Sequence, residues 1–141
     1  MDVLRFPHDD KNKRDLFGWI GEVCASASVR AELGAPVTSA PGDVWFVAVE
    51  GKRLLGFCGV SILKNRKAKL HGMVVLAPSQ KSIEETLKTM AEVEAIGHGA
   101  TEILVVDKET RQKEYEGQGW KVIGDRGKQY RLFSKALEVP V

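Results

Sequence analysis

Apolar residues near the start of the chain recur at steps of three and four, the spacing of one face of an amphipathic helix. They are Leu16, Ile20, Val23, Cys24, Ala27 and Ala31. Asp9 or Asp10 stands before this stripe, and either carboxylate can cap a helix there. Gly18 and Gly21 each weaken a helix by about 1 kcal/mol relative to alanine, so the pattern fits one bent helix or two short ones.

Runs of β-branched and aromatic residues predict three consecutive strands in the next part of the chain. The runs cover residues 44–50, 54–63 and 68–76. A short glycine-containing connection between the first two is typical of a hairpin, and a basic turn leads to the third, which completes a meander. Residues 3–6 add an edge strand. Glycines inside the runs indicate bulges or close backbone approaches: Gly56, Gly59 and Gly72.

The spacing of the apolar residues becomes that of a helix again from Ser82 onward, and a glycine-rich segment at 97–99 ends that helix. Its apolar face consists of Ile83, Leu87, Met90, Ala91 and Ala95. Residues 102–107 form a continuous apolar run, which suits a central strand parallel to its neighbour across the helix. A polar helical segment at 108–119 then leads to two last strands, at 120–124 and 129–137.

The predicted fold class is therefore α/β (α+β), with a mixed, mostly antiparallel sheet of about six to seven strands flanked by three or four helices. A chain of 141 residues fits a single domain, residues 1–141, around one core. Hydrophobic residues at 43% and charged residues at 28% are ordinary for a soluble globular protein, so neither disorder nor a fibrous class is indicated.

The charge balance argues little for nucleic acid or a membrane surface as a partner. Lys and Arg number 21 and Asp and Glu 19, with both signs interleaved. The basic turns at 63–69 and 125–131 lack the aromatic platform on which bases stack. Cys24 and Cys58 lie far apart and outside any metal pattern, which favours reduced thiols and no metal site. With no apolar run of roughly 18 residues and no signal peptide, we expect a cytoplasmic protein, and a free edge strand allows a homodimer.

Two segments near the C-terminus carry a resemblance to a known family. Residues 114–120 place a tyrosine at a helix end and a glycine at a corner before a tryptophan, and residues 130–137 follow as a last strand. Over residues 43–137 the chain resembles the GCN5-related N-acetyltransferase (GNAT) family. The resemblance implies a GNAT-like fold and an acetyl-CoA dependent N-acyltransferase, in which an amine attacks the thioester directly.

The same resemblance assigns residues to the acetyl-CoA site. In the family, the pantetheine arm pairs with the strand that leads to a glycine-rich loop, and backbone amides at the start of the next helix hold the pyrophosphate. A basic residue ahead of the tyrosine can reach a phosphate. The implied acetyl-CoA contacts are Met73, Val74, Val75, Ser79, Gln80, Lys81, Ser82 and Arg111.

This loop departs from the glycine pattern of the family. Ser82 and Glu84 stand where glycines are expected, and Ser82 with Glu85 has the spacing of a capping box, which satisfies the amides that a phosphate would use. Glu84 and Glu85 also place negative charge near the start of this helix. Such a charge is worth about 0.3–1 kcal/mol, enough to weaken the binding of a phosphate there several-fold. The chain is thus either an enzyme or a catalytically silent GNAT-fold binding or assembly module that has lost the CoA site.

Two residues are candidates for catalysis. The resemblance implies that the Tyr115 hydroxyl protonates the departing thiolate, and a phenol with a pKa of about 10 holds its proton at neutral pH. The alternative is that Tyr115 packs over the sheet, with Trp120 as a core anchor. His71 is the candidate base for the acceptor amine, and the alternative is that His71 is a packed or surface residue without a catalytic role. No motif in residues 10–43 identifies that amine.

Overall fold

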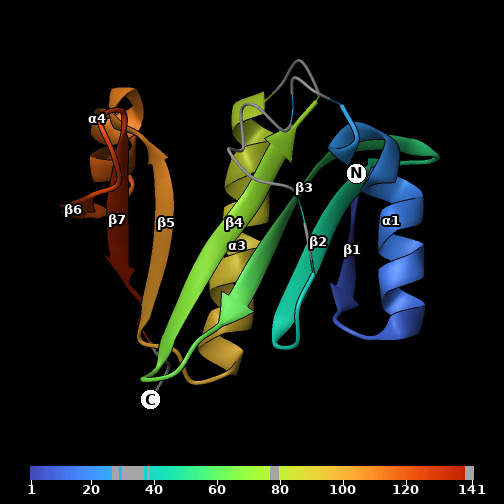
Figure 1. Ribbon diagram of the computed structural model, residues 1–141, viewed down its shortest axis with the longest axis horizontal. Helices are drawn as coiled ribbons and strands as arrows, with labels where there is room; N and C mark the ends of the chain where they lie inside the picture. Colours follow the sequence, from blue (N-terminus) through green and yellow to red (C-terminus); the bar gives the residue numbers. More distant parts are fainter. Residues whose placement is uncertain (27–28, 30–36, 38, 77–79, 139–141) are drawn as a thin grey trace.

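The computed structural model describes residues 1–26, 29, 37, 39–76 and 80–138. One seven-stranded sheet has the strand order β1-β2-β3-β4-β5-β7-β6 and is antiparallel except between β4 and β5 (Figure 1). The strands are β1 (Asp2–Pro7), β2 (Asp43–Glu50), β3 (Arg53–Ile62), β4 (Lys67–Val75), β5 (Glu102–Lys108), β6 (Lys121–Asp125) and β7 (Tyr130–Ala136). The helices are α1 (Asp10–Cys24), α3 (Gln80–Gly97) and α4 (Gln112–Gly117), with a 3-10 turn η1 (Glu109–Arg111) before α4. The predicted fold class is confirmed.

Helix α1 begins where its sequence predicts and covers one face of the sheet. The Asp9 carboxylate accepts the backbone N–H of Asn12 at 2.7 Å, which satisfies one of the free amides of the first turn. Leu16 and Ile20 are fully buried and pack in the cluster that contains Trp45. The helix is continuous from Asp10 to Cys24, through Gly18 and Gly21; Ala27 and Ala31, the last residues of the predicted stripe, lie outside the described residues.

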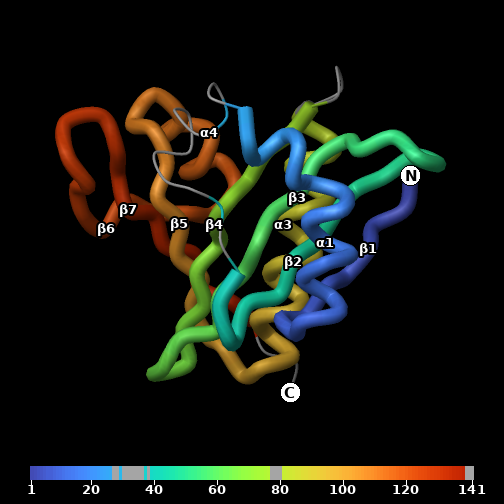
Figure 2. Tube along the Cα trace, turned by 45° about the vertical axis from the view of Figure 1, so that its right-hand side comes forward, coloured from blue at the N-terminus to red at the C-terminus, as the bar shows by residue number. Residues whose placement is uncertain are grey.

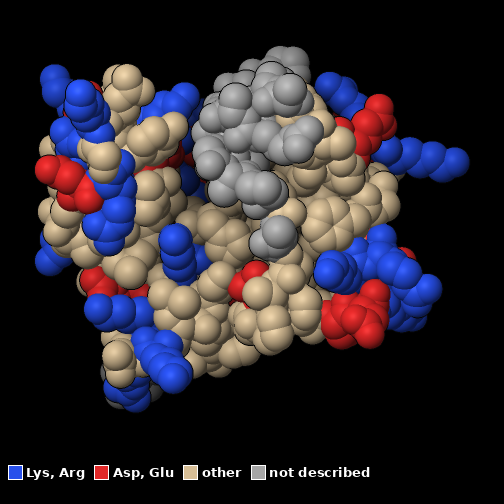
Figure 3. Space-filling model, viewed as in Figure 1, with Lys and Arg blue, Asp and Glu red and all other residues tan. Residues whose placement is uncertain are grey.

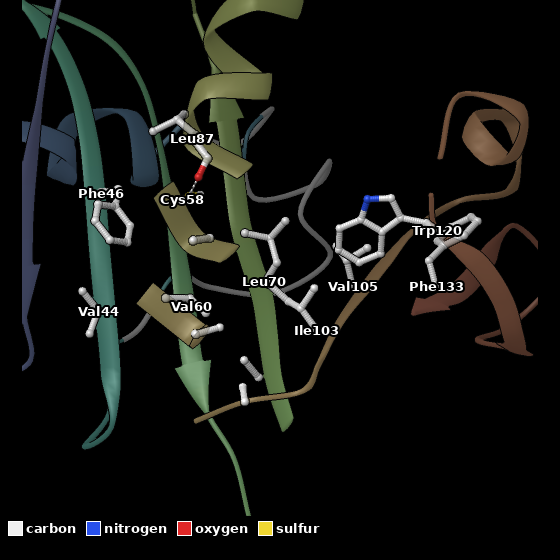
Figure 4. Close-up of a cluster of buried hydrophobic side chains, with 14 of the residues drawn as sticks. Val44, Phe46, Cys58, Val60, Leu70, Leu87, Ile103, Val105, Trp120 and Phe133 are labelled. Carbon is white, nitrogen blue, oxygen red and sulfur yellow. Dashed lines mark hydrogen bonds between the residues drawn. The ribbon is translucent and has the colours of Figure 1, made fainter. Parts of the chain in front are cut away.

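Helix α3 covers the opposite face, as its apolar period predicts. Its buried residues Ile83, Leu87, Ala91 and Ala95 belong to the larger core cluster. Figure 4 shows side chains of this cluster that come from the strands and from α3, among them Phe46, Val60, Leu70, Ile103 and Leu87. The sheet is therefore buried on both faces along β2, β3 and β4.

The predicted capping box at the start of α3 is wrong. The helix begins at Gln80, so Ser82 lies inside its first turn and its backbone carbonyl accepts the Thr86 hydroxyl at 2.9 Å. A residue with helical backbone within the first turn cannot be the N-cap, because an N-cap residue has an extended backbone. The spacing of Ser82 and Glu85 is present, but the helix starts before it.

Strands β4 and β5 touch over only four residue pairs. Their parallel pairing runs from Lys67 opposite Glu102 to Leu70 opposite Val105 and ends there. Beyond this point β4 continues to Val75 beside β3, while β5 continues to Lys108 beside β7. The two strands lie side by side at one end and diverge toward the other (Figures 1 and 2). The sheet is consequently open along the second half of β4.

A bulge in β4 sets which side chains face this opening. His71 pairs with Gly59 and Val74 with Phe57, so two residues of β4 lie opposite the single residue Cys58. One of the two is Gly72, with φ +61°, and a Cβ atom there would lie 2.8 Å from the Trp45 ring. The predicted close approach at Gly72 is confirmed.

None of the described helices is long and apolar enough to cross a membrane.

Replacing Gly72 with alanine tests the bulge. We expect a loss of about 2–4 kcal/mol of unfolding free energy, because a left-handed backbone costs a side chain about 1–2 kcal/mol and the contact with Trp45 adds an overpacking cost. Gly51 has the same φ of +61°, and a Cβ atom there would meet nothing within 4 Å, so Gly51→Ala should lose only the backbone part. Urea unfolding of both variants measures the difference, and equal losses would contradict the close packing.

Candidate active site

A cleft of about 1290 Å³ lies where β4 and β5 separate, and it is lined from both faces of the sheet. Figure 3 shows a hollow between the surface of β5–β7, which is rich in Lys and Arg, and the surface of β2–β4. From the α1 face the lining includes Asp43, Trp45, Ser61 and His71, and from the α3 face it includes Glu84, Lys88, Asp107, Arg111 and Tyr115. Groups from the two faces therefore meet in one space.

His71 ends a hydrogen-bonded chain that starts at a buried carboxylate. Asp43 is 7% exposed, and its Oδ1 accepts the Ser61 hydroxyl at 2.6 Å while its Oδ2 accepts the Ala40 amide at 2.9 Å. Ser61 has a single hydroxyl proton, which points to Asp43, so its oxygen can only accept a proton from His71 Nε2, 2.9 Å away. The proton of neutral His71 is therefore on Nε2, and the lone pair is on Nδ1.

The surroundings of His71 keep it neutral and fix its ring. Burial lowers the pKa of His71, Asp43 opposes this by raising it, and Lys69 lowers it further. The imidazole packs edge-on to Trp45, with ring centroids 5.1 Å apart, and a Cβ atom at Gly59 would lie 2.7 Å from its Cε1. Among the described residues nothing hydrogen bonds to Nδ1. His71 can thus accept a proton at neutral pH.

Tyr115 packs on the other side of the opening. It is 1% exposed, its ring stacks on Phe133 at 4.5 Å and meets Trp120 edge-on at 5.5 Å. Its hydroxyl donates to Asp107 Oδ2 at 2.6 Å, and burial, followed by the charge of Asp107, raises its pKa. The packing role is confirmed, with Trp120 also buried. The role of Tyr115 as general acid stays a prediction.

Arg111 is held by three carboxylates from different elements. Its Nη1 lies 2.8 Å from Glu84 Oε1 on α3 and 2.9 Å from Asp107 Oδ2 on β5. Its Nη2 lies 3.0 Å from Glu114 Oε1 on α4, and the hydrogen bonds from Arg111 lower the pKa of Glu114. A phosphate could bind this guanidinium only by displacing a carboxylate. The predicted phosphate contact of Arg111 therefore stays a prediction, and in this structure the three carboxylates compete with a phosphate for the guanidinium.

The architecture was compared with known proteins. No family model and no curated protein sequence matches the chain. An acetyltransferase of the GNAT family from Staphylococcus aureus has a TM-score of 0.66 at 13% identity, covering 97% of this chain and 100% of its own. The aminoglycoside 6'-N-acetyltransferase from Enterococcus faecium has a TM-score of 0.71 at 18% identity, with all of both chains covered. An aminoglycoside 6'-N-acetyltransferase complexed with coenzyme A has a TM-score of 0.68 at 17% identity, again over all of both chains.

The chain has the GNAT fold. Structural similarity at sequence identities below 25% establishes the fold alone, so any argument about the chemistry has to come from the side chains in the cleft. The predicted parallel pairing across α3 and the last antiparallel strands are the parts of this GNAT fold that surround the cleft.

The predicted CoA contacts lie along the open part of β4 and the start of α3. Met73 and Val75 line the cleft, whereas Val74 packs toward the α1 face. Lys81 also lines the cleft. Both Lys81 and Ser82 are exposed. Gln80 is the first residue of α3, and Ser79 lies outside the described residues. These assignments remain predictions.

Four residues of the cleft were not identified as candidates from the sequence. Asp43 and Ser61 meet only because β2 and β3 pair in the register that sets them opposite each other. Asp107 ends an apolar strand, and Lys88 follows Leu87 on the buried side of α3. The one available signal was Lys88, a charged residue beside an apolar stripe. Within the described part of the chain, no three His, Cys, Asp or Glu side chains are grouped to hold a metal ion.

Two substitutions that each remove a charge near His71 test the hydrogen-bonded chain, because they should shift the pKa of His71 in opposite directions. Asp43→Asn should lower the pKa of His71 further, because the carboxylate raises it, and Lys69→Gln should raise it, because the ammonium lowers it. NMR titration of the imidazole nitrogens measures both pKa values and identifies the tautomer. A proton on Nδ1 in the neutral protein, or shifts of the same sign, would contradict the arrangement.

Proposed function

We propose that this protein is an acetyl-CoA dependent N-acyltransferase that acts on an unidentified amine in the cytoplasm. The observation that carries the proposal is a neutral imidazole in a cleft that passes through the sheet of a GNAT fold, with no hydrogen bond to its Nδ1 from any described residue. An acceptor amine is protonated near pH 7 and cannot attack until a base removes a proton. His71 is suited to this step.

The Asp43–Ser61–His71 chain stabilises the charge that His71 gains. When Nδ1 takes the proton, the Nε2–H still donates to Ser61, whose hydroxyl donates to the Asp43 carboxylate. The amine nitrogen then bonds to the thioester carbon, and the carbon–sulfur bond breaks with its electron pair on sulfur. A covalent cysteine intermediate finds no support, because burial raises the pKa of Cys58 to about 12 and also raises that of Cys24.

The cleft also suits the other substrate. Pairing of β4 with β5 ends at Leu70, so backbone groups of residues 71–75 face the opening and can bind an extended, amide-containing arm. Lys81 stands exposed at the start of α3, where the helix dipole favours an anion. The neighbour complexed with coenzyme A has the same fold, which supports acyl-CoA as a partner.

Removal of the base should lower turnover and leave acyl-CoA binding nearly unchanged. We expect His71→Gln to reduce kcat by about 10²-fold, the usual contribution of a general base. His98→Gln, just after the last residue of α3, is the matched control. Turnover is followed as free thiol released from acetyl-CoA with a panel of diamines, amino sugars and amino acids. Calorimetry with acetyl-CoA is the prior test, and the absence of binding by the wild type would favour the silent binding module.

Removal of the competing carboxylate should strengthen CoA binding. Glu84 makes two of the contacts of Arg111, with its oxygens 2.8 and 2.9 Å from the guanidinium nitrogens. Glu84→Gln weakens that pair and removes a negative charge, so the Kd for CoA should fall about two- to fivefold, or about 0.3–1 kcal/mol. Glu85→Gln, which removes the same charge one residue away on the exposed side, should have a smaller effect. Equal effects would mean that Arg111 stays with its carboxylates.

A further inference from the structure

Lys88 carries a buried charge that the protein only loosely satisfies. The residue is 6% exposed, on α3, and its Nζ lies 3.6 Å from Glu84 Oε1 and 3.5 Å from Gln118 Oε1. It also lies 4.2 Å from the centre of the Tyr115 ring. An ammonium has three N–H donors, and good bonds to oxygen are about 2.7–3.2 Å long. Among the described residues, none gives Lys88 such a bond.

The neighbouring cation shows the contrast. Arg111 has three carboxylates within 3.0 Å, whereas the charges of the same Glu84, Glu114 and Asp107 act on Lys88 without a close hydrogen bond. Buried N–H donors without a close acceptor cost free energy, and in a cleft a ligand can supply that acceptor. Lys88 lines the same cleft as His71.

The position of Lys88 points to the reacting end of the acyl donor. Lys88 lies eight residues after Gln80, where α3 begins, so it is about 12 Å along the helix axis from the end that suits phosphates. The exposed cations Lys81 and Lys108 line the cleft and are available for those phosphates. Inside the cleft, the anion that the proposed reaction creates is the sulfur of the leaving thiolate.

We propose that Lys88 is a catalytic residue that stabilises and protonates this sulfur, an inference that rests on the proposed function. As the carbon–sulfur bond breaks, its electron pair goes to sulfur and Lys88 Nζ donates a proton to it. The acceptor nitrogen loses two protons on becoming an amide. His71 passes the first to water, and the second returns through water to Lys88. The products are an amide, a thiol and one proton.

Tyr115 is less suited to this donation. Its hydroxyl proton lies on the path to Asp107, and its loss would leave a phenolate 2.6 Å from that carboxylate. Two negative charges at that distance repel strongly in a buried site. Burial raises the pKa of Tyr115 but lowers that of Lys88, with Glu84 opposing the latter shift, so the ammonium gives up a proton more readily than the phenol.

The test compares coenzyme A with desulfo-coenzyme A, which lacks the sulfur, on the wild type and Lys88→Met. Methionine fills the same space without charge and suits a helix, and Lys121→Met on β6 is the control. In the wild type, the ultraviolet absorbance of bound thiolate should show the thiol ionising at a pH about one unit lower than in free CoA, a tenfold stabilisation. Lys88→Met should lose this shift and keep its affinity for desulfo-coenzyme A. Lys88→Arg should keep the shift yet lose turnover by at least tenfold, because an arginine does not release its proton.

The outcomes separate the two proposals. If the wild type binds neither CoA nor its desulfo analogue, the proposed function is wrong and this inference falls with it. If the wild type binds both, but Lys88→Met keeps the shift, or weakens both ligands equally, Lys88 does not act on the sulfur. Loss of the shift in Tyr115→Phe but not in Lys88→Met would likewise overturn the assignment.

Discussion

The early end of the pairing between β4 and β5 is the constraint on which the rest of the structure depends. Four residue pairs join the two strands, and each strand then stays with its other neighbour. A sheet that ends its pairing in this way leaves backbone donors and acceptors that need another partner. It also connects the α1 face with the α3 face, so side chains that a continuous sheet would separate line one cleft.

The charged groups of the cleft follow from that opening. On the α1 face, a buried carboxylate acts through Ser61 and sets the tautomer of His71. On the α3 face, the Arg111 guanidinium joins Glu84 of α3 to Asp107 and Glu114 of the C-terminal part of the chain. These half-buried contacts tie together two parts of the sheet that share few backbone bonds, and the same contacts compete with an incoming phosphate. Lys88 is the cation of this network whose partners Glu84 and Gln118 lie 3.6 and 3.5 Å from its Nζ.

Most of the fold could be predicted from the sequence, because the evidence for it is local. The period of the apolar residues gave both long helices, the meander and the parallel central strand, and Asp9 marked the start of α1. The capping box failed since Ser82 and Glu85 have the correct spacing but the helix already runs through Ser82. Arg111 was expected to be available for a phosphate, yet one of its partners, Glu84, is 27 residues away in the chain. Such a pairing has no periodic signal.

The sequence by itself determined the elements, their order and the packing of Tyr115, since backbone conformation and the burial of apolar faces depend on residues a few positions apart. Tertiary structure alone decided which polar groups meet: Asp43 faces Ser61 through strand register, the Gly72 bulge keeps His71 beside Trp45, and Lys88 lies over the Tyr115 ring. The reason is physical. A hydrogen bond or an ion pair depends on positions to within a few tenths of an ångström, and only the complete packing of the sheet and helices sets them.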